Sequence, residues 1–511
     1  MPIISDSKTT LSLLLNRAEQ SGNTLFATFG EQHLTVGDLK QQVEFTAISL
    51  SASGIKQGDR VAAMLDNHLD YVVLFFALIW VGAIHVPVNT RLRHDSLGFL
   101  IQHSELKLII TEQHYPDHMK SIDGLNRNTQ FVDRSPSSGF EWELKIDTQC
   151  TIPVKAKSDN VLFIMYTSGT TGPPKGVMVT DKMLRASAFA RKKTSDAKQG
   201  DVFMVWEPLY HIGAAQLLPL ALEVGVTLAF IGSFSASKFW QQARDIGATQ
   251  IHFLGGILQI LLRQPTNLLE TRHNCRIAWG GGAPVGVAKE FESRFNIEVR
   301  ENYGMTEASS LTSINDDGHK GSVGKPAPYC DVKIVNEQGQ NLEMGKQGEI
   351  VVRELESGLI TPGYFRNEEA TSKTIQNGWL RTGDLGYLDA AGYLYYTGRL
   401  KESIRRRGEN ISAWAIERVA ERLECVEQAA ALGVPDDLGD EEIKLFVKLT
   451  DGKQHTNPSK QIFKWCEQHL PSIQVPRYLS IIDEFPTTGT QRIRKELLPK
   501  TVDDCETDSD R

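Results

Sequence analysis

A segment rich in glycine and hydroxyl side chains, residues 167–176, constrains the fold of this 511-residue chain more than any other feature. The apolar run 162–166 leads directly into it, and the apolar residues 177–179 follow it. Its three glycines allow sharp turns that present backbone N–H groups to an anion, while four hydroxyl groups and Lys175 add donors and positive charge. The pattern predicts a phosphate-binding loop between two strands, with a surface turn as the alternative. It is not a Walker A loop, because Gly176 follows Lys175.

The residues before this loop alternate between β-rich and helical patterns, which is typical of parallel sheets covered by helices. We therefore expect an α/β fold whose large N-terminal domain, residues 1–400, contains layered, mostly parallel sheets with flanking helices. Residues 134–160 are turn-rich and predict a connecting stretch. The expected elements are helices over 11–21 and 37–53, strands at 60–65 and 107–111, and a buried helix from residue 71 that turns into a strand ending near residue 88.

The pattern changes after Gly398, where a short basic run precedes a new helix. Ser412 is a suitable N-cap for that helix, with Ile416, Val419 and Leu423 on one face. We expect a small mobile α+β domain over residues 401–500, followed by a disordered tail, residues 501–511, that is acidic and polar. The further elements expected in this domain are strands at 429–434, 443–449 and 478–482 and a helix at 459–469.

Composition excludes several classes of protein. With 63 acidic and 55 basic residues the net charge is −8, which argues against nucleic acid or an anionic membrane as a partner. The six cysteines are widely spaced, so a structural zinc site is not expected. Glycine, histidine and proline interrupt the most apolar run, residues 71–88, and no signal peptide is visible. We expect a cytoplasmic protein, not stably inserted in a membrane, with a small-molecule partner; a homodimer is left open.

The glycine-rich loop resembles the signature of the adenylate-forming superfamily, which comprises acyl-CoA synthetases, adenylation domains of peptide synthetases and luciferases. Further segments resemble this family's motifs in the expected order, so that the resemblance covers residues 160–495. These segments are Pro208–Gly213, Gly280–Pro284, Tyr303–Glu307, Trp379–Asp384 and Gly398–Glu402.

The resemblance implies an ATP-dependent acid–CoA ligase that uses Mg²⁺ and coenzyme A. Such an enzyme joins a carboxylate to the α-phosphate of ATP, releases pyrophosphate, and passes the acyl group to coenzyme A. The chain shows no carrier-protein domain after residue 495, which favours coenzyme A as acceptor. Two alternatives remain: a stand-alone enzyme that loads a separate carrier protein, and a non-catalytic nucleotide-binding relative.

The resemblance also assigns residues to the nucleotide. Thr306 would donate to the α-phosphate, Glu307 would hold Mg²⁺, and Asp384 with Arg399 would bind the ribose. Those expected at the β- and γ-phosphates are Thr167, Ser168, Gly169, Thr170, Thr171, Gly172 and Lys175. Those expected around adenine are Gly281, Gly282, Ala283, Asn302, Tyr303 and Gly304.

The acid and coenzyme A sites follow from the same resemblance. The acyl pocket is expected to include Trp206, His211, Trp279, Gly280 and Met305. Lys401 is the expected hinge, and the pantetheine tunnel is expected at Arg406, Arg407, Gly408 and Glu409. Residues 205–211 and the loop 405–410 resemble the branch of crotonobetaine/carnitine–CoA ligases. A quaternary ammonium substrate could use the ring faces of Trp206 and Trp279 and the charge of Glu207, so we expect a short or medium polar acid.

Two positions depart from the family pattern. Asp181 stands where the family often has histidine. The glycine–lysine pair that usually supplies the catalytic lysine for adenylation is replaced by Gln491 and Arg492. Arginine keeps the charge but spreads it over a planar group. We expect Arg492 to act in adenylation, with Lys495 as the second candidate.

Overall fold

The computed structural model divides the chain into two compact units. Met1–Val332 with Val352–Leu380 form the larger unit, and Lys333–Val351 with Arg381–Arg511 form the smaller one. The expected boundary at Lys401 stays a prediction. The described residues are 2–92, 94–112, 129–135, 139–141, 153–167, 174–254, 256–267, 270–283, 285–406, 409–435, 441–450, 457–487, 493–502 and 507–508.

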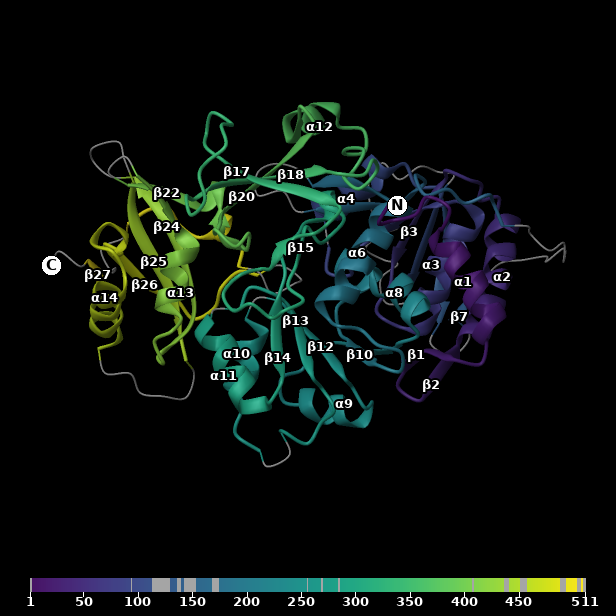
Figure 1. Ribbon diagram of the computed structural model, residues 1–511, viewed down its shortest axis with the longest axis horizontal. Helices are drawn as coiled ribbons and strands as arrows, with labels where there is room; N and C mark the ends of the chain where they lie inside the picture. Colours follow the sequence, from purple (N-terminus) through teal and green to yellow (C-terminus); the bar gives the residue numbers. More distant parts are fainter. Residues whose placement is uncertain are drawn as a thin grey trace. The chain divides into compact units, whose positions relative to one another are not determined.

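The larger unit contains two seven-stranded sheets (Figure 1). The first has the order β14-β13-β12-β10-β11-β1-β2, and all neighbours are parallel except β1 and β2. Its carboxyl edge, where parallel strands place ligand-binding residues, is formed by β10, β12, β13 and β14. The strands are β1 (Leu25–Phe29), β2 (Gln32–Thr35), β10 (Val202–Val205), β11 (Thr227–Phe230), β12 (Gln250–Leu254), β13 (Ile277–Gly281) and β14 (Glu298–Glu301).

The second sheet has the order β7-β6-β5-β3-β4-β8-β9 and is parallel except at its two edges. β6 continues to Ser135 and β7 adds an edge pair, so the described residues 134, 135 and 139–140 are strand where we expected a connecting stretch. Its strands are β3 (Arg60–Met64), β4 (Ile84–Pro87), β5 (Leu108–Glu112), β6 (Gln130–Ser135), β7 (Gly139–Phe140), β8 (Val161–Thr167) and β9 (Lys175–Thr180).

Helices cover both sheets in layers. One core joins the facing sides of the two sheets to α1, α2, α3, α6 and α8, while α9, α10 and α11 pack on the other side of the first sheet. α4 packs on the other side of the second sheet, which Ala62 and Met64 face. Val61 and Ala63 face the shared core, because successive side chains of a strand point to opposite sides of the sheet. The helices are α1 (Thr10–Ser21), α2 (Val36–Ala52), α3 (Leu69–Val81), α4 (His94–Ser104), α6 (Asp181–Thr194), α7 (Ile212–Ala215), α8 (Leu217–Val224), α9 (Phe239–Asp245), α10 (Ile257–Leu262) and α11 (Val285–Phe295).

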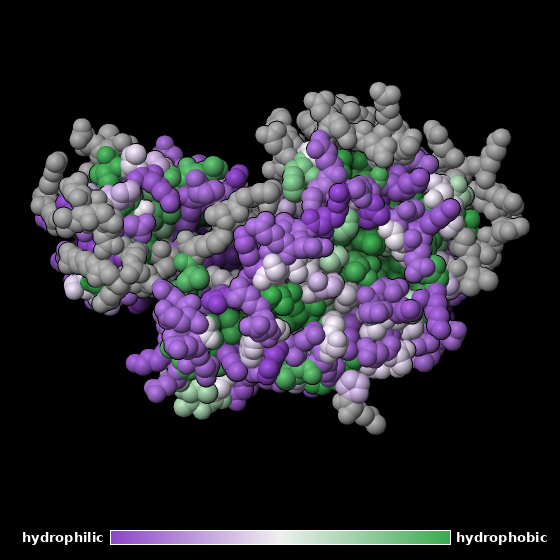
Figure 2. Space-filling view, turned by 90° about the horizontal axis from the view of Figure 1, so that it is seen from above, coloured by the Kyte–Doolittle hydropathy of each residue, from purple (hydrophilic) through white to green (hydrophobic). Residues whose placement is uncertain are grey.

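Local sequence explains the most buried helix, α3. The His68 side chain caps its start by accepting from the Tyr71 amide, and the helix ends at Gly82, whose φ of 73° suits glycine. The next residues form β4, which confirms the expected helix that turns into a strand. Among the described residues no helix has the length and apolarity needed to span a membrane. In the view of Figure 2 hydrophilic side chains cover most of the surface that is coloured.

A further sheet links the two units along the chain. Its strand order is β17-β18-β20-β19, with β21 paired to β20, and the division between the units passes through β17, β18 and β20. The elements here are η1 (Thr306–Ala308), β15 (Ser313–Ile314), β16 (Lys325–Pro326), β17 (Cys330–Val335), β18 (Gly348–Glu354), α12 (Glu368–Thr374), β19 (Ile375–Gln376), β20 (Trp379–Leu388), β21 (Leu394–Arg399) and η2 (Leu400–Glu402).

The carboxyl-terminal part of the smaller unit has the expected α+β composition. Ser412 caps α13 by accepting from the Ala415 amide, as expected, but the helix ends at Ala420, before Leu423. Thr507 and Asp508 pair with β26, so these two residues depart from the expected disordered tail. The elements are β22 (Ser403–Arg406), β23 (Glu409–Ser412), α13 (Ala413–Ala420), β24 (Val426–Pro435), β25 (Glu441–Leu449), α14 (Pro458–His469), η3 (Ser472–Gln474), β26 (Tyr478–Ile481), η4 (Lys495–Leu497) and β27 (Thr507–Asp508).

Candidate functional site

The glycine-rich loop connects two antiparallel strands, as the sequence predicts. Thr167 at the end of β8 is paired in register with Lys175 at the start of β9. The strands therefore hold the two ends of the loop side by side. The other residues expected at the phosphates, Ser168, Gly169, Thr170, Thr171 and Gly172, lie outside the described part of the chain.

Tyr364 connects the lysine of this loop with the expected magnesium ligand. The Lys175 ammonium lies 4.7 Å from the centre of the Tyr364 ring, and the Tyr364 hydroxyl donates to Glu307 Oε1 at 2.9 Å. Burial, together with the charge of Glu307, raises the pKa of Tyr364, so it remains a donor. Residues 175, 307 and 364 thus form one cluster, and sequence reasoning found only the first two.

Glu307 lies in a buried turn. It sits in the short helix η1, with 6% of its surface exposed, and its carbonyl accepts from the Thr361 amide at 2.8 Å. Thr306, at the start of η1, is half-buried. No cluster of three His, Cys, Asp or Glu side chains suited to a metal occurs in the described ranges. A single carboxylate fits Mg²⁺, which commonly takes its other ligands from water and substrate phosphates.

The turn expected near adenine begins with the last two residues of β13 and is held by close backbone packing. A β-carbon at Gly280 would collide with the Phe253 carbonyl, and Gly282 has a φ of 91°. Both positions therefore require glycine. Glu301 Oε1 accepts from the amides of Gly282 and Ala283, at 3.0 and 2.7 Å. These two amides are already paired, and no motif identified Glu301.

The segment 302–305 runs beside this turn. The Asn302 amide donates to the Gly280 carbonyl at 2.8 Å, and Tyr303 is buried. A β-carbon at Gly304 would overlap the Ser310 carbonyl, so the chain passes too close there for another residue type. Met305 is half-buried and precedes η1.

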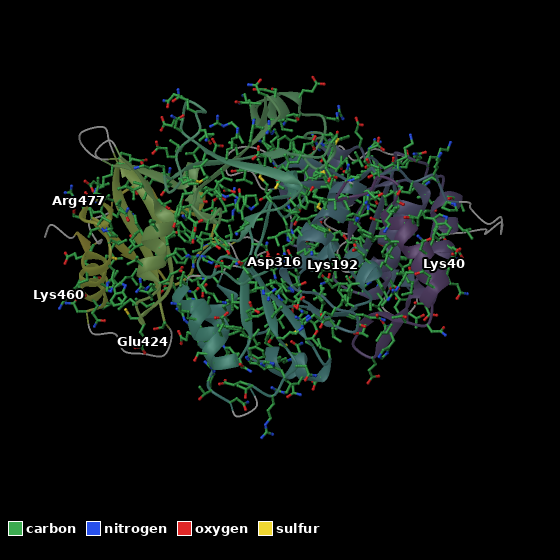
Figure 3. The ribbon with its side chains drawn as sticks, viewed as in Figure 1. Lys40, Lys192, Asp316, Glu424, Lys460 and Arg477 are labelled. Atoms are coloured by element: carbon green, nitrogen blue, oxygen red, sulfur yellow. The ribbon has the colours of Figure 1, made fainter. Side chains whose placement is uncertain are left out.

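An arginine orients the Asn302 side chain. Its Oδ1 accepts from Arg191 Nη1 at 2.8 Å, and its expected place beside adenine stays a prediction. Arg191 comes from the last turn of α6, next to Lys192, which Figure 3 labels. Burial lowers the pKa of Arg191 to about 9, which still leaves it charged at neutral pH.

Arg191 begins a stack of four planar side chains, Arg191, Trp279, His252 and Trp206, which we call the four-residue stack. The guanidinium lies 3.9 Å from the Trp279 ring centre. His252 lies 4.8 Å from Trp279, with 14° between the planes, and 4.3 Å from Trp206, with 2° between them. Trp279 lies on β13, His252 on the neighbouring β12, and Trp206 directly follows β10, the next strand in the sheet.

This stack bears on the expected role of Trp279. His252 reaches the indole from β12, while Arg191, bound to Asn302 beyond the end of β14, reaches it from the other side. These two contacts, and an exposed fraction of 2%, count against a Trp279 ring face for a cationic substrate. The Trp206 ring also packs edge to face with Phe234, with 5.9 Å between the ring centres.

Glu207 adds a buried charge beside the stack. Its Oε2 lies 3.4 Å from His252 Nε2. Burial acts to raise the pKa of Glu207, but interaction with His252 and the charge of Arg191 outweigh it, so the pKa lies below its ordinary value. Burial lowers the pKa of His211, and its Nε2 has no hydrogen-bond partner among the described residues. The expected acyl-pocket segment thus has a polar wall.

The two residues expected at the ribose come together in the smaller unit. Asp384 in β20 and Arg399 in β21 are paired in register, and Arg399 Nε lies 3.1 Å from Asp384 Oδ1. The Thr382 hydroxyl donates to the Ile350 carbonyl and accepts from the Asp384 amide. The carboxylate is therefore fixed on a strand and beside a cation.

Lys495 has the environment of a structural residue. Its Nζ lies 2.8 Å from Glu402 Oε2 and 2.6 Å from Glu417 Oε1. Glu417 Oε1 also accepts from the Ala431 amide at 2.7 Å. Two carboxylates hold the ammonium, which counts against the second candidate for adenylation. Arg492 lies outside the described residues.

Arg406 is also held within its own unit. Its Nη1 donates to the Ile473 and Val475 carbonyls, both at 2.9 Å, and its Nη2 lies 2.6 Å from Glu442. The guanidinium is buried, and the expected place of Arg406 in the pantetheine tunnel stays a prediction. The structure does not describe Arg407 and Gly408, nor the side chains of Glu409 and Lys401.

Asp181, the other departure from the family pattern, is buried at the start of α6. Its Oδ2 accepts from Arg185 at 2.6 Å and its Oδ1 accepts from the Thr10 amide at 2.7 Å. The residue therefore fixes α1 against α6.

Comparison with known proteins gives consistent matches. A profile of the AMP-binding enzyme family matches residues 14–365, and one of the AMP-binding enzyme C-terminal domain matches residues 415–492. Crotonobetaine/carnitine–CoA ligase of Salmonella arizonae is 30% identical over 91% of this chain and 93% of its own length. A probable CoA ligase of Humulus lupulus is 34% identical over 96% of both chains.

Solved structures agree in fold. The o-succinylbenzoate CoA synthetase of Bacillus subtilis, in complex with its acyl-adenylate intermediate, is 26% identical with a TM-score of 0.83, over 96% of this chain and 98% of that one. Another structure of that enzyme, with ATP and magnesium ion, gives 26% identity and a TM-score of 0.82, over 95% and 98%. The expected α/β fold class, with a large N-terminal and a smaller C-terminal part, is confirmed.

Proposed function

Since the chain belongs to the AMP-binding enzyme family, we propose that it is an ATP-dependent acid–CoA ligase. Its first half-reaction joins a carboxylate to the α-phosphate of ATP and releases pyrophosphate. Its second transfers the acyl group from AMP to the thiol of coenzyme A. The relatives named as CoA ligases, matched over nearly their whole length, support this reaction.

The observation that carries the proposal is the cluster of residues 175, 307 and 364. Adenylation brings two anions together, so the site must neutralise charge. Lys175 ends the glycine-rich loop and would face the phosphates, while Glu307 would hold Mg²⁺. The metal, when bound, supplies positive charge to the phosphate oxygens. Tyr364 holds both side chains in one place before any ligand arrives.

The remaining nucleotide contacts are proposals of the same kind. Tyr303 and the turn 280–283 would border adenine, and Thr306 would donate to the α-phosphate. Asp384 would accept from the ribose hydroxyls, with Arg399 beside it. Arg492 would stabilise the adenylation transition state, since Lys495 is bound by two carboxylates.

We propose that coenzyme A enters after the smaller domain moves about Lys401, as the resemblance implies. Gly408 and Glu409 would then line the pantetheine path. Arg406 would fix the hairpin β22–β23 in place, because its buried guanidinium pairs with Glu442 and donates to the carbonyls of residues 473 and 475.

We propose a short or medium polar acid as substrate. Glu207, His252 and the unpartnered Nε2 of His211 support a polar pocket wall, because buried polar atoms normally find a hydrogen-bond partner. A quaternary ammonium group could reach at most the Trp206 face, since Trp279 is covered.

The test is to incubate the protein with ATP, Mg²⁺ and a panel of acids, and to measure AMP and pyrophosphate with and without coenzyme A. The panel contains carnitine, crotonobetaine, betaine, hydroxy acids, fatty acids and aryl acids. AMP release that depends on both one acid and coenzyme A is the expected result. Pyrophosphate release that coenzyme A does not change would point to loading of a carrier protein. No pyrophosphate with any acid, and no binding of AMP, would contradict the proposal.

A further inference from the structure

The four-residue stack contacts or adjoins three segments proposed for substrates in the larger unit. Trp206 precedes the acyl segment 207–213, Trp279 precedes the adenine turn 280–283, and Arg191 binds Asn302. One group of side chains therefore joins the residues proposed for the acid to those proposed for the nucleotide.

The chemistry of this group is unusual for a core. Arg191 and Glu207 are 3% and 6% exposed, and burying charges costs free energy that their attraction repays only in part. Replacing buried charges by apolar side chains of the same volume is often neutral or stabilising. The charged groups therefore call for a role beyond stability.

We propose that Arg191 and Glu207 are positioning residues with separate tasks: Arg191 fixes the nucleotide segments, and Glu207 fixes the wall of the acyl pocket. This inference rests on the proposed function and deepens it.

Arg191 makes two contacts with the segments proposed to bind the nucleotide. Its guanidinium fixes the Trp279 ring from one face, and the next residues are the tightly packed turn 280–283. Its Nη1 binds the side chain of Asn302, whose backbone amide is bound to Gly280. Moving Arg191 would release both segments that face adenine. A planar guanidinium can stack and donate at the same time, which an ammonium cannot do.

Glu207 contacts the segment proposed to form the acyl pocket. Its carboxylate lies against the α-carbon of Gly213, where a β-carbon would collide with both oxygens. The carboxylate thereby contacts the first turn of α7, where His211 occupies the N-cap position. Asn67 binds the same loop through two hydrogen bonds. Its Nδ2 donates to the Glu207 carbonyl and its Oδ1 accepts from the Leu209 amide, each at 3.0 Å. His252 holds the Glu207 carboxylate from the stack.

The test compares three conservative variants with the wild type: Arg191→Lys, Glu207→Gln and Arg185→Lys. Arg185 is the matched control, because it is a second buried arginine on α6 whose partners are Asp181, Ser158 and Ser5. For each protein we would measure the Kd of AMP by calorimetry, the KM of the best acid of the panel, and the Tm.

The expected pattern separates the two ends of the stack. Arg191→Lys raises the Kd of AMP about tenfold, the usual effect of losing a charged hydrogen bond, with a smaller change in the KM of the acid. Glu207→Gln raises the KM of the acid about tenfold and leaves the Kd of AMP unchanged. Arg185→Lys lowers only the Tm.

Other outcomes overturn the inference. If Arg191→Lys lowers the Tm but leaves the Kd of AMP unchanged, as Arg185→Lys does, the arginine only packs. If Arg191→Lys and Glu207→Gln each raise the Kd of AMP and the KM of the acid by the same factor, the stack acts as a single unit. The proposal of separate tasks is then wrong. A wild-type protein that binds no AMP would instead contradict the proposed function.

Discussion

Tyr364 donates its hydroxyl hydrogen to the carboxylate of Glu307 at 2.9 Å, while the face of its ring lies under Lys175. The tyrosine and Glu307 are separated by 57 positions in the chain. One side chain therefore sets the distance between the cation proposed for the phosphates and the anion proposed for Mg²⁺. The hydroxyl orients the carboxylate, and the ring supports the ammonium.

The Tyr364→Phe variant tests the first of these tasks. It removes the hydrogen bond to Glu307 and keeps the ring under Lys175. We expect the Mg²⁺ concentration for half-maximal pyrophosphate release to rise about tenfold, because a hydrogen bond to a charged group is lost. Titrating Mg²⁺ at saturating ATP measures this change.

Tyr329→Phe is the matched control, since the buried Tyr329 hydroxyl donates to the Leu311 carbonyl at 2.6 Å. That variant should lose stability and keep the Mg²⁺ dependence of the wild type. Equal Mg²⁺ dependence in the Tyr364→Phe protein and the wild type would show that the hydroxyl does not orient the metal ligand.

The fold was accessible from sequence because its signals are local. The strand 60–64, the helix 69–81 with its terminal glycine, and the Ser412 cap each depend on a few neighbouring residues. Helix ends were less accurate: α13 stops before Leu423, because the chain turns at residues 421–424 to enter β24.

The contacts inside the site were not accessible, because they join residues far apart in the chain. Arg191 and Asn302 are separated by 111 positions, and nothing near Arg191 distinguishes it from Arg185 on the same helix. Trp279 and His252 become neighbours only when β12 and β13 pair. Motifs therefore located the segments of the site, while the side chains that orient them appeared only in the fold.

Lys495 and Arg492 can be distinguished by mutation. We expect Lys495→Met to destabilise the protein by about 3 kcal/mol, because Glu402 and Glu417 lose their buried counter-charge. Urea unfolding measures this loss. Folded Lys495→Met protein should still release pyrophosphate, whereas Arg492→Ala should not. Activity that survives Arg492→Ala and vanishes in folded Lys495→Met would reverse the assignment.

His85 should make the protein less stable in acid. Complete burial in β4 lowers its pKa to about 3, from 6.5 in the unfolded chain. Since the folded-state pKa is the lower one, its contribution to stability is fully present above pH 6.5 and is lost as the pH falls toward 3. Between these pH values the unfolded state binds one more proton than the folded state. The free energy of unfolding therefore falls by about 1.4 kcal/mol for each pH unit of acidification.

The His85→Gln variant isolates this contribution, because glutamine keeps a polar group near the Tyr71 hydroxyl and does not titrate. Urea unfolding between pH 6.5 and pH 4.5 should give a shallower loss of stability for the variant than for the wild type. Parallel slopes for the two proteins would mean that His85 is protonated in the folded state.

Asp384 offers the sharpest test of the nucleotide site. It lies on β20 with 3% of its surface exposed and pairs with Arg399 at 3.1 Å, so its carboxylate is oriented before a ligand binds. If it accepts from the ribose hydroxyls, wild-type protein should bind ATP at least about tenfold more tightly than 2′,3′-dideoxy-ATP. Asp384→Asn should reduce that preference, because an amide oxygen accepts more weakly than a carboxylate. Calorimetry with the two nucleotides and the two proteins completes the cycle. If the preference for ATP is the same in both proteins, the carboxylate serves only Arg399 and the ribose is bound elsewhere.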